Sequence, residues 1–477
     1  MATRTRINAA HIIATQNNEH RHLRDGVVVY EGDRIIHVGK SFDGEADQTI
    51  DLPHGVLTPG FINTHAHLAG SPLDKSFIED VGPRQFYGSG LFEYLPVRGG
   101  AQDAEADVAC LAFSMAELLR TGTTTIMEIG HRAPEAVEQA NKVGMRLYMG
   151  LGYRSGKWLT TDGKRVSWEW DEPAGYAGMD RAIKFIEDYD GQSNDRIKGF
   201  LSPMQIDTCT EDLLRKSKEA ADSMGVPIAL HAAQSVNEFN EMVARHGRSP
   251  IEWLEDINFL DSNVILGHAI ILAGGSWANY AGNDIEVLAR THANVAHCVW
   301  VFARRGIAME SFARYTQAGV NMTLGTDTAP QSMLEALRWA AVVSKIVDRQ
   351  TGVATAADVF KAATLNGAKA LNRDDLGRIE VGAKADLLIW DGDTIFMSPL
   401  RDPIKNIVYS AEAEDLNTVI IDGEIRVKDR QVLGVDTRKL ALDLQAAGDR
   451  MWPEMAQYDW NGRDADKLSP QSFPEWK

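Results

Sequence analysis

The feature that most constrains this fold is a series of short apolar segments that alternate with helical stretches through the middle of the chain. Several are continuous apolar runs, which is typical of parallel strands buried on both faces. Two of the stretches between them, 108–122 and 211–225, have apolar residues at helical spacing and end in glycine. The strand candidates are 60–67, 123–130, 146–153, 198–204, 227–233, 264–270, 293–299 and 321–327.

Repeated strand–helix units of this kind predict an α/β fold. Eight strands in roughly 320 residues suit a (β/α)8 barrel, the TIM barrel, with insertions. A doubly wound open sheet is the alternative, but the chain contains no GxGxxG or GxxxxGK[ST] phosphate-binding loop to support it. We therefore predict a barrel over residues 60–377.

Both ends of the chain carry β-rich segments of a different character. In DGVVVYEGDRIIHVG, residues 25–39, two β-branched runs flank a turn signal. The segments 382–391 and 417–427 are similar, and Asp422-Gly423 marks a second hairpin.

Because chain termini commonly lie close together, we expect these segments to form one composite β-sandwich domain. Its residues are 1–59 plus 378–440, and a separate C-terminal β-domain is the alternative. Residues 441–477 are predicted to be a tail that is first helical and then irregular.

Charge and cysteine content narrow the setting of the protein. The chain has 67 acidic and 49 basic side chains, a net charge of −18, which repels nucleic acid and anionic membranes. Its three cysteines form no CxxC pair, which argues against a disulfide framework or a thiolate zinc site. No apolar run is long enough for a membrane span, so we expect a cytoplasmic protein that binds no membrane. We also expect that it binds no nucleic acid and forms a homo-oligomer, a dimer or larger.

Polar residues fall at the C-terminal ends of the strand candidates, where barrel enzymes keep their active sites. His65 and His67 alternate, so along a strand both imidazoles point to one face and can bind one metal. A single histidine of this kind is more often a core residue. The site prediction depends on the register shared by all of them: His65, His67, His231, His268, His297 and Asp327.

The segments PGFINTHAH, LHAAQ, LGHAI, VAHC and LGTDTAP resemble the amidohydrolase superfamily. The branch they resemble includes triazine hydrolases and S-adenosylhomocysteine deaminases. The resemblance implies a barrel with a composite β-sandwich and a single divalent metal. It places His268 as the residue that polarises the substrate, and the implied metal ligands are His65, His67, His231 and Asp327.

Three neutral imidazoles and one carboxylate leave such a metal positively charged. The pKa of its bound water then falls toward 7, which makes a hydroxide nucleophile available, and Asp327 can accept the proton. In this superfamily a second metal usually needs a carboxylated lysine at the end of the fourth strand. Lys198 lies at the beginning of that strand, so we expect a mononuclear site that holds zinc or iron.

The chain departs from the pattern of this branch at Gln234. Deaminases of the branch carry a glutamate there, three residues after the fifth-strand histidine, and use it to protonate the departing nitrogen. An amide has no proton to give at neutral pH, so Gln234 is expected to hold the substrate. Glu238 follows one helical turn later, and we expect it on a solvated helix face. The alternative is that it lies near Gln234, if the segment is helical.

A second departure replaces the polar residues that often follow the seventh-strand histidine by VWVF, which predicts an apolar pocket wall. Trp300 and Phe302 are candidates for that wall, although both can equally be core residues. The long loop after His67 should cover the metal. His131 and Glu128 close the second strand, with either a site or a structural role. Besides Gln234 and His268, the predicted substrate contacts are His297, Trp300 and Tyr87.

Together these features predict a hydrolase that acts on carbon–nitrogen bonds other than peptide bonds. We expect a metal-bound hydroxide to cleave an amide, urea, carbamate or related C–X bond in a small, largely apolar nitrogen compound, with Asp327, His268 and Gln234 as catalytic residues. The first alternative is a deaminase or chlorohydrolase of an N-heterocycle such as a triazine, purine or pterin. The second is a non-catalytic assembly protein that has lost its metal.

Overall fold

Eight parallel strand positions form the centre of the molecule in the computed structural model, which describes residues 2–476. One sheet has the order β10-β7-β6-β5, with β11 also paired to β7, and the other has the order β12-β13-β14-β15. The strands are β5 Phe61–Ala66, β6 Thr123–Gly130, β7 Arg146–Tyr153, β10 Ile197–Gly199, β11 Ser202–Pro203, β12 Ile228–Ala232, β13 Val264–His268, β14 Asn294–His297 and β15 Asn321–Leu324.

Isolated parallel bridges join the two sheets at both seams. Leu201 pairs with Ile228 at one seam, and Ala66 pairs with Asp327 at the other. The first pairing joins the fourth and fifth strand positions, and the second joins the first and last. The eight positions therefore form the predicted (β/α)8 barrel.

The fourth strand position differs from the single run predicted over 198–204. It is divided into β10 and β11, which both pair with β7 in the same register, and between them the Leu201 amide donates to the Pro227 carbonyl on the β12 side. Pro203 has no amide to continue a ladder, which keeps this position short.

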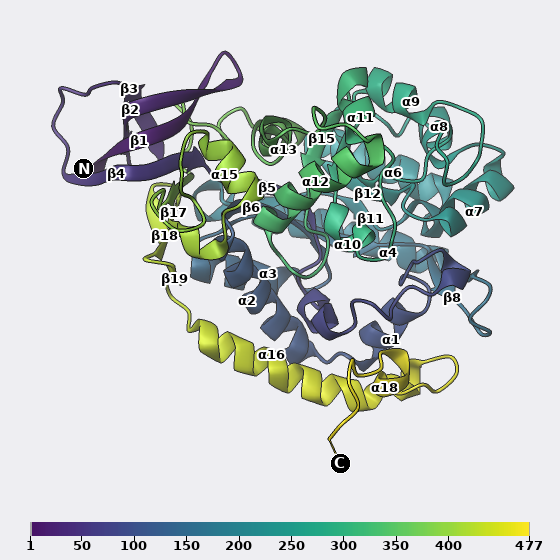
Figure 1. The fold of residues 1–477 in the computed structure, drawn as a ribbon. Helices are drawn as coiled ribbons and strands as arrows, with labels where there is room; N and C mark the ends of the chain where they lie inside the picture. Colours follow the sequence, from purple (N-terminus) through teal and green to yellow (C-terminus); the bar gives the residue numbers. More distant parts are fainter. Residues whose placement is uncertain (1, 477) are drawn as a thin grey trace.

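Helices cover the outside of the barrel, as Figure 1 shows. The two predicted helices are α2 Ala104–Arg120 and α6 Glu211–Met224, and Gly225 ends α6 in the left-handed conformation with φ 67°. No helix among residues 2–476 is long and apolar enough to cross a membrane. The others of the barrel region are α3 Ala133–Val143, α4 Glu172–Tyr189, α5 Gln192–Asp195, α7 Val236–His246, α8 Pro250–Asp256, α9 Asp284–Thr291, α10 Val299–Ala303, α11 Phe312–Ala318, α12 Met333–Asp348, α13 Ala356–Ala362 and α14 Leu365–Ala370.

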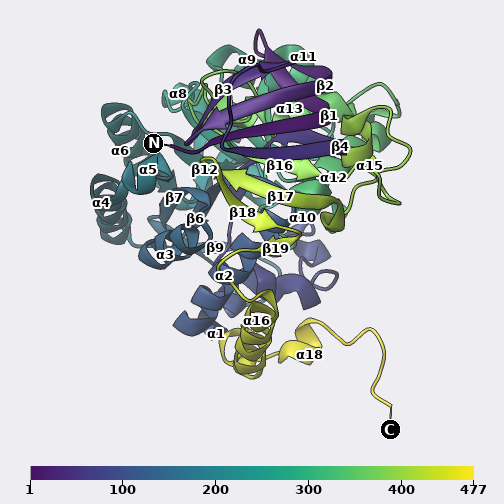
Figure 2. The same cartoon turned by 90° about the vertical axis from the view of Figure 1, so that its left-hand side faces the viewer.

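Strands from both chain ends form a separate eight-stranded sheet, which faces the viewer in front of the barrel in Figure 2. Its order is β19-β18-β17-β16-β4-β1-β2-β3, and Asp422-Gly423 forms the predicted turn between β17 and β18. The strands are β1 Arg4–Gln16, β2 Glu19–Glu31, β3 Arg34–Gly39, β4 Gln48–Pro59, β16 Leu387–Trp390, β17 Leu416–Ile421, β18 Glu424–Lys428 and β19 Gln431–Val432, and α15 Pro403–Tyr409 lies between β16 and β17.

Strand β16 links the two apolar cores. Leu387 and Ile389 point into the cluster of the end sheet, whereas Leu388 and Trp390 point into the barrel cluster. This alternation is the period of a strand buried on both faces. The end sheet is therefore packed firmly against the barrel.

A long segment after β5, residues 68–103, crosses the C-terminal end of the barrel. It contains η1 Ser71–Ser76, η2 Arg84–Phe86 and α1 Tyr94–Ala101. The C-terminal helices run along its outer side in Figure 1 and share an apolar cluster with it. These helices are α16 Thr437–Met451, η5 Trp452–Glu454, α17 Met455–Tyr458 and α18 Ala465–Leu468.

Candidate metal centre

The predicted histidines lie at the C-terminal ends of their strands. His65 and His67 come from the end of β5, and His231 is the fourth residue of β12. His268 and His297 are the last residues of β13 and β14. Because carboxyl ends of parallel strands meet at one end of a barrel, the chain places these residues together.

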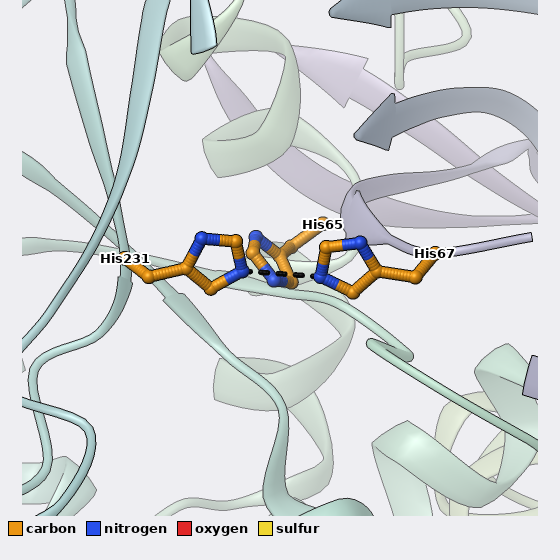
Figure 3. Close-up of side chains that lie close together, drawn as sticks. All are labelled: His65, His67 and His231. Atoms are coloured by element: carbon orange, nitrogen blue, oxygen red, sulfur yellow. Dashed lines mark hydrogen bonds between the residues drawn. The ribbon is translucent and has the colours of Figure 1, made fainter. Parts of the chain in front are cut away.

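Three of the rings face one another in Figure 3. One nitrogen from each of His65, His67 and His231 lies within 4.8 Å of the others. The Nδ1 atom of His67 lies 2.8 Å from the Ile129 carbonyl, and that of His231 lies 2.5 Å from the Met204 carbonyl. Since a carbonyl oxygen only accepts, both Nδ1 atoms carry the proton and both Nε2 atoms point inward.

The two inward Nε2 atoms of His67 and His231 are 3.1 Å apart, as the dashed line in Figure 3 marks. With the proton on each Nδ1, both Nε2 atoms present a lone pair toward each other. Two lone pairs at this distance repel each other unless a further proton or a cation lies between them. Burial lowers the pKa of His231 to about 3, which keeps that ring neutral at pH 7. Tetrahedral zinc with bonds of about 2.0–2.1 Å separates two nitrogens by roughly 3.3 Å, so the pair suits a metal.

His65 completes the group. Its side chain is buried, and neither ring nitrogen has a hydrogen-bond partner among the described residues. Burial lowers its pKa well below the usual value, and the neighbouring rings of His231 and His268 lower it further. A buried, neutral imidazole with no hydrogen-bond partner is suited to bind a metal.

Asp327 lies between this group and His268. Its backbone is fixed to β5, because its amide donates to the His65 carbonyl at 2.9 Å and its carbonyl accepts from the His67 amide at 2.7 Å. Its Oδ1 is 3.5 Å from His67 Nε2, and its Oδ2 is 3.6 Å from His268 Nε2. Burial raises the pKa of this carboxyl group, so it is a better proton acceptor than an exposed aspartate.

His268 is buried against an aromatic side chain. The Phe302 ring packs edge-on against its imidazole, with 4.6 Å between ring centroids. Burial lowers the pKa of His268 well below its ordinary value, so the ring is neutral at pH 7. A neutral imidazole carries one ring proton that it can donate to a developing negative charge.

Gln234 is buried two residues beyond β12. Its Nε2 donates a hydrogen bond to Gln205 Oε1, and Gln205 forms a backbone bridge with His231. The amide is thus tied to the strand that carries a candidate ligand. Gln205 was not singled out from the sequence, although its place directly after the fourth strand candidate could have identified it.

The expectation of a solvated face for Glu238 is wrong. The residue lies in α7 but is only 1% exposed, and its carboxylate accepts the amides of Ala233 at 2.5 Å and Gln234 at 3.2 Å. These amides belong to the turn before the helix and have no intrahelical partner. Burial, followed by the charge of Asp207, raises the pKa of Glu238 well above its usual value.

The other predicted substrate contacts are His297, Trp300 and Tyr87, and they differ in burial and in the residues that they contact. His297 is buried, its Nδ1 has no partner among the described residues, and burial lowers its pKa to about 4. Trp300 packs against Trp339 of α12, with 5.1 Å between ring centroids, whereas Phe302 is the aromatic residue that contacts His268. Tyr87 is 52% exposed in the segment over the barrel.

The two polar residues that close β6 have structural contacts. Glu128 is buried and accepts the Leu68 amide at 2.7 Å, and burial raises its pKa to about 8. His131 is largely exposed and lies 3.0 Å from Asp107 of α2. Of the two, only Glu128 binds the backbone next to a candidate ligand.

A second group of donors shares His65. One nitrogen each of His65 and His268 and the Cys298 sulfur lie within 4.8 Å of one another. Burial and the charge of Asp327 raise the pKa of the Cys298 thiol well above its usual value, so it stays protonated and is a poor ligand. The group of His65, His67 and His231 is the better metal site.

Comparison with known proteins assigns the chain to a family. The 5-methylthioadenosine/S-adenosylhomocysteine deaminase of Halobacterium salinarum is 30% identical over 444 residues, which cover 89% of this chain and 93% of that protein. The 5'-deoxyadenosine deaminase of Methanosarcina barkeri is 28% identical over 445 residues, or 92% of this chain and 96% of that protein.

Solved structures share the fold at lower identity. An adenosine deaminase of Xanthomonas campestris with bound zinc has a TM-score of 0.80 and 23% identity, covering 94% of this chain and 98% of its own. The atrazine chlorohydrolase of Arthrobacter aurescens, complexed with zinc, has a TM-score of 0.81 and 20% identity. The match covers 93% of this chain and 100% of that chain. The sequence model of the amidohydrolase family matches residues 56–426. This chain therefore belongs to the amidohydrolase family.

Proposed function

We propose that this protein is a metal-dependent hydrolase that cleaves a carbon–nitrogen bond other than a peptide bond in a small nitrogen compound. The observation that carries the proposal is the pair of inward Nε2 atoms of His67 and His231, 3.1 Å apart, each with its proton held on the far side of the ring. His65 and Asp327 complete a donor set of three nitrogens and one oxygen. A non-catalytic assembly protein has no need of such a set.

These four residues would hold one divalent metal, and zinc is the first to test. When bound, it would lower the pKa of a water molecule toward 7 and so supply a nucleophile at neutral pH. Lys198 pairs instead with Asp195 at 2.8 Å, at the start of its strand, which favours a mononuclear site. Iron is the second metal to test, because mixed nitrogen and oxygen ligation accommodates it as well.

Asp327 and His268 would divide the proton chemistry. Asp327 lies against the metal ligands and accepts the proton of the attacking water. His268, neutral and next to Asp327 Oδ2, donates its ring proton to the atom of the substrate that gains negative charge. Gln234 binds the substrate through its amide and gives no proton to the leaving group.

Gln234 favours substrates whose leaving group needs little protonation, such as a substituted amide, urea or carbamate. Deamination of an adenine nucleoside is the second candidate, favoured by the names of the deaminases of Methanosarcina barkeri and Halobacterium salinarum, which match nearly the whole chain. The two candidates differ in whether His268 and Asp327 alone can deliver a proton to the departing nitrogen.

The test combines metal analysis with a substrate screen. Purified protein should contain about one transition metal per chain, lose all activity with a chelator and recover it with zinc. The screen pairs ureas, amides, carbamates and triazines with 5'-deoxyadenosine and 5-methylthioadenosine. Two metals per chain would contradict the mononuclear site, and full activity after metal removal would contradict the proposal as a whole.

A further inference from the structure

One arginine beside the metal centre has no acceptor. Arg305 is the second residue after α10, and among residues 2–476 its guanidinium makes no hydrogen bond and no ion pair, while its Nε is fully buried. Two nearby arginines, in contrast, have hydrogen-bond partners. Arg98 pairs with Asp74 at 2.5 Å, and Arg304 donates to the Ala329 carbonyl at 2.9 Å.

Arg305 lies close enough to the site for the charge of Asp327 to act on it. Its amide donates to the Phe302 carbonyl, so the two residues lie three apart on one turn and share a face. Phe302 packs on His268 from that face. The Arg305 guanidinium lies against Gly90 of the segment over the barrel, where a Cβ would be 3.5 Å from its Nη2. Arg305 thus lies between that segment and the metal centre.

The charges around Arg305 do not balance within the chain. Two buried carboxylates lie near Arg305. Asp74 is already paired with Arg98 and accepts the Tyr94 hydroxyl at 2.8 Å, and Asp327, a candidate metal ligand, forms no ion pair with Arg305. Arg304 bonds only to neutral oxygens, of Ala329 and Thr328. Two guanidinium groups therefore stand without a carboxylate partner among the described residues, in a chain whose net charge is −18.

Burial and the charge of Arg304 lower the pKa of Arg305 to about 10, which still leaves it cationic at neutral pH. A half-buried cation without a partner is unfavourable unless a ligand supplies the opposite charge. A guanidinium presents planar, paired N–H donors that match a carboxylate or a phosphate.

We propose that Arg305 binds an anionic group of the substrate, a carboxylate or a phosphate, while the bond to be cleaved lies at the metal centre. This inference rests on the proposed hydrolase function and specifies its substrate. Phe302, between Arg305 and His268, contacts the apolar middle of the molecule. The substrate is then a nitrogen compound with an apolar body and an anionic end, rather than the largely apolar compound expected from the sequence.

Calorimetric binding of three small probes to the zinc-loaded protein tests this without turnover. The probes are benzoate, phenyl phosphate and the neutral benzamide. Wild-type protein should bind one of the anions at least about tenfold more tightly than benzamide. Arg305→Met should lose that preference through weaker anion binding, and Arg305→Lys should keep part of it. The anion that binds more tightly identifies the group.

The matched control is Arg401→Met, which removes one positive charge from an exposed arginine and should bind all probes as the wild type does. Equal binding of anions and benzamide by the wild type would overturn the proposal. Unchanged anion binding by Arg305→Met would do the same, since the metal would then be the binding group. If Arg305→Met fails to fold, anion binding by Arg305→Lys and Arg305→Gln is compared with that of the wild type. Unchanged anion binding by both variants would then overturn the proposal.

Failure of the hydrolase proposal has a different signature. It would appear as absence of turnover in the metal-dependent screen, whatever the anion preference. Once a substrate is found, its free acid and its methyl ester give a second readout. Arg305→Met should lower kcat/KM at least about tenfold for the acid, mainly through KM, and leave the ester unchanged.

Discussion

At the metal centre, contacts on the far side of two imidazole rings determine what the near side can bind. The carbonyls of Ile129 and Met204 hold the protons of His67 and His231 on Nδ1. The two Nε2 atoms then carry lone pairs that already point toward the metal site, so neither ring has to rotate to bind a metal. Such outer hydrogen bonds orient metal ligands and raise their basicity, and their loss typically costs 10–100-fold in metal affinity or activity.

Loss of a ligand should be more severe than loss of an outer contact. We expect His65→Ala or Asp327→Ala to lower both metal content and turnover by more than about 100-fold, because each removes a ligand and Asp327 is also the proton acceptor. Metal analysis and steady-state kinetics measure the two effects. His54→Ala, at an exposed histidine outside the site, is the control. Near wild-type activity in either site variant would place the centre elsewhere.

Gln234 gives a prediction about the leaving group. General acid catalysis typically contributes ~10²–10⁴-fold, and an amide cannot supply it. Across substrates with leaving groups of increasing pKa, log kcat/KM should fall steeply for the wild type and less steeply for Gln234→Glu. The two slopes are the measurement.

Equal, shallow slopes in both proteins would show that His268 or Asp327 already protonates the leaving group. Ring deamination would then become the favoured reaction. Gln234→Ala separates substrate binding from proton transfer, since it should raise KM without changing the slope.

A buried carboxyl group away from the centre makes folding stability depend on pH. Asp284 accepts the Ser249 hydroxyl at 2.6 Å, and burial raises its pKa from 3.8 to about 6. Because the folded state then binds more protons than the unfolded state, the free energy of unfolding contributed by this group falls as pH rises from 3.8 to about 6 and is constant above that.

Relative to Asp284→Asn, the wild type should therefore lose up to roughly 3 kcal/mol of stability between pH 4 and 7. Urea denaturation of both proteins at several pH values measures this difference. A difference that does not change with pH would contradict the raised pKa.

Among the secondary-structure elements, α16 supports the segment that covers the site. Its Met451 is 1% exposed and packs in one cluster with Leu73, Phe77 and Val97 of residues 68–103. Arg450 of the same helix pairs with Asp103 at 2.8 Å. The helix thus links the end of the chain to the loop that precedes α2.

Met451→Ala should lower the free energy of unfolding by about 2–5 kcal/mol, because it leaves a cavity in this cluster. It should also raise KM, since the segment over the site is held less firmly. Leu442→Ala is the control on the same helix, because Leu442 is 62% exposed and its loss should change stability by no more than about 0.5 kcal/mol. Denaturant unfolding and steady-state kinetics of both variants measure the two effects.

At the scale of the whole molecule, buried charges join the barrel to the end sheet. Arg146, the first residue of β7, is fully buried and lies 2.6 Å from Asp422 and 3.2 Å from Asp386. Both aspartates belong to the end sheet and its turns. Lys384 adds a further contact to Asp422 at 3.2 Å.

Arg146→Met should cost about 3–5 kcal/mol, because it leaves buried carboxylates without a partner. Lys184→Met removes an exposed pair with Asp188 and should cost less than about 1 kcal/mol. Denaturant unfolding compares the two. A small effect of Arg146→Met would show that the end sheet depends on its apolar contacts alone.

The sequence by itself determined the barrel, the β-rich chain ends and the strand ends that carry His65, His67, His231, His268 and Asp327. It could do so because strand burial and side-chain alternation are local properties with a short period. The HxH pair predicts a shared face whatever lies around it. The break in the fourth strand was not predicted, because the choice between two neighbouring strands depends on both partners.

Only the tertiary structure decided the contacts made between segments far apart in the chain. It buried Glu238 under a turn, placed Phe302 rather than Trp300 against His268, and left Arg305 beside the centre without an acceptor. It also set the tautomers of His67 and His231 through carbonyls of other strands. Burial, charge balance and proton position depend on these distant partners, which no local pattern in the sequence specifies.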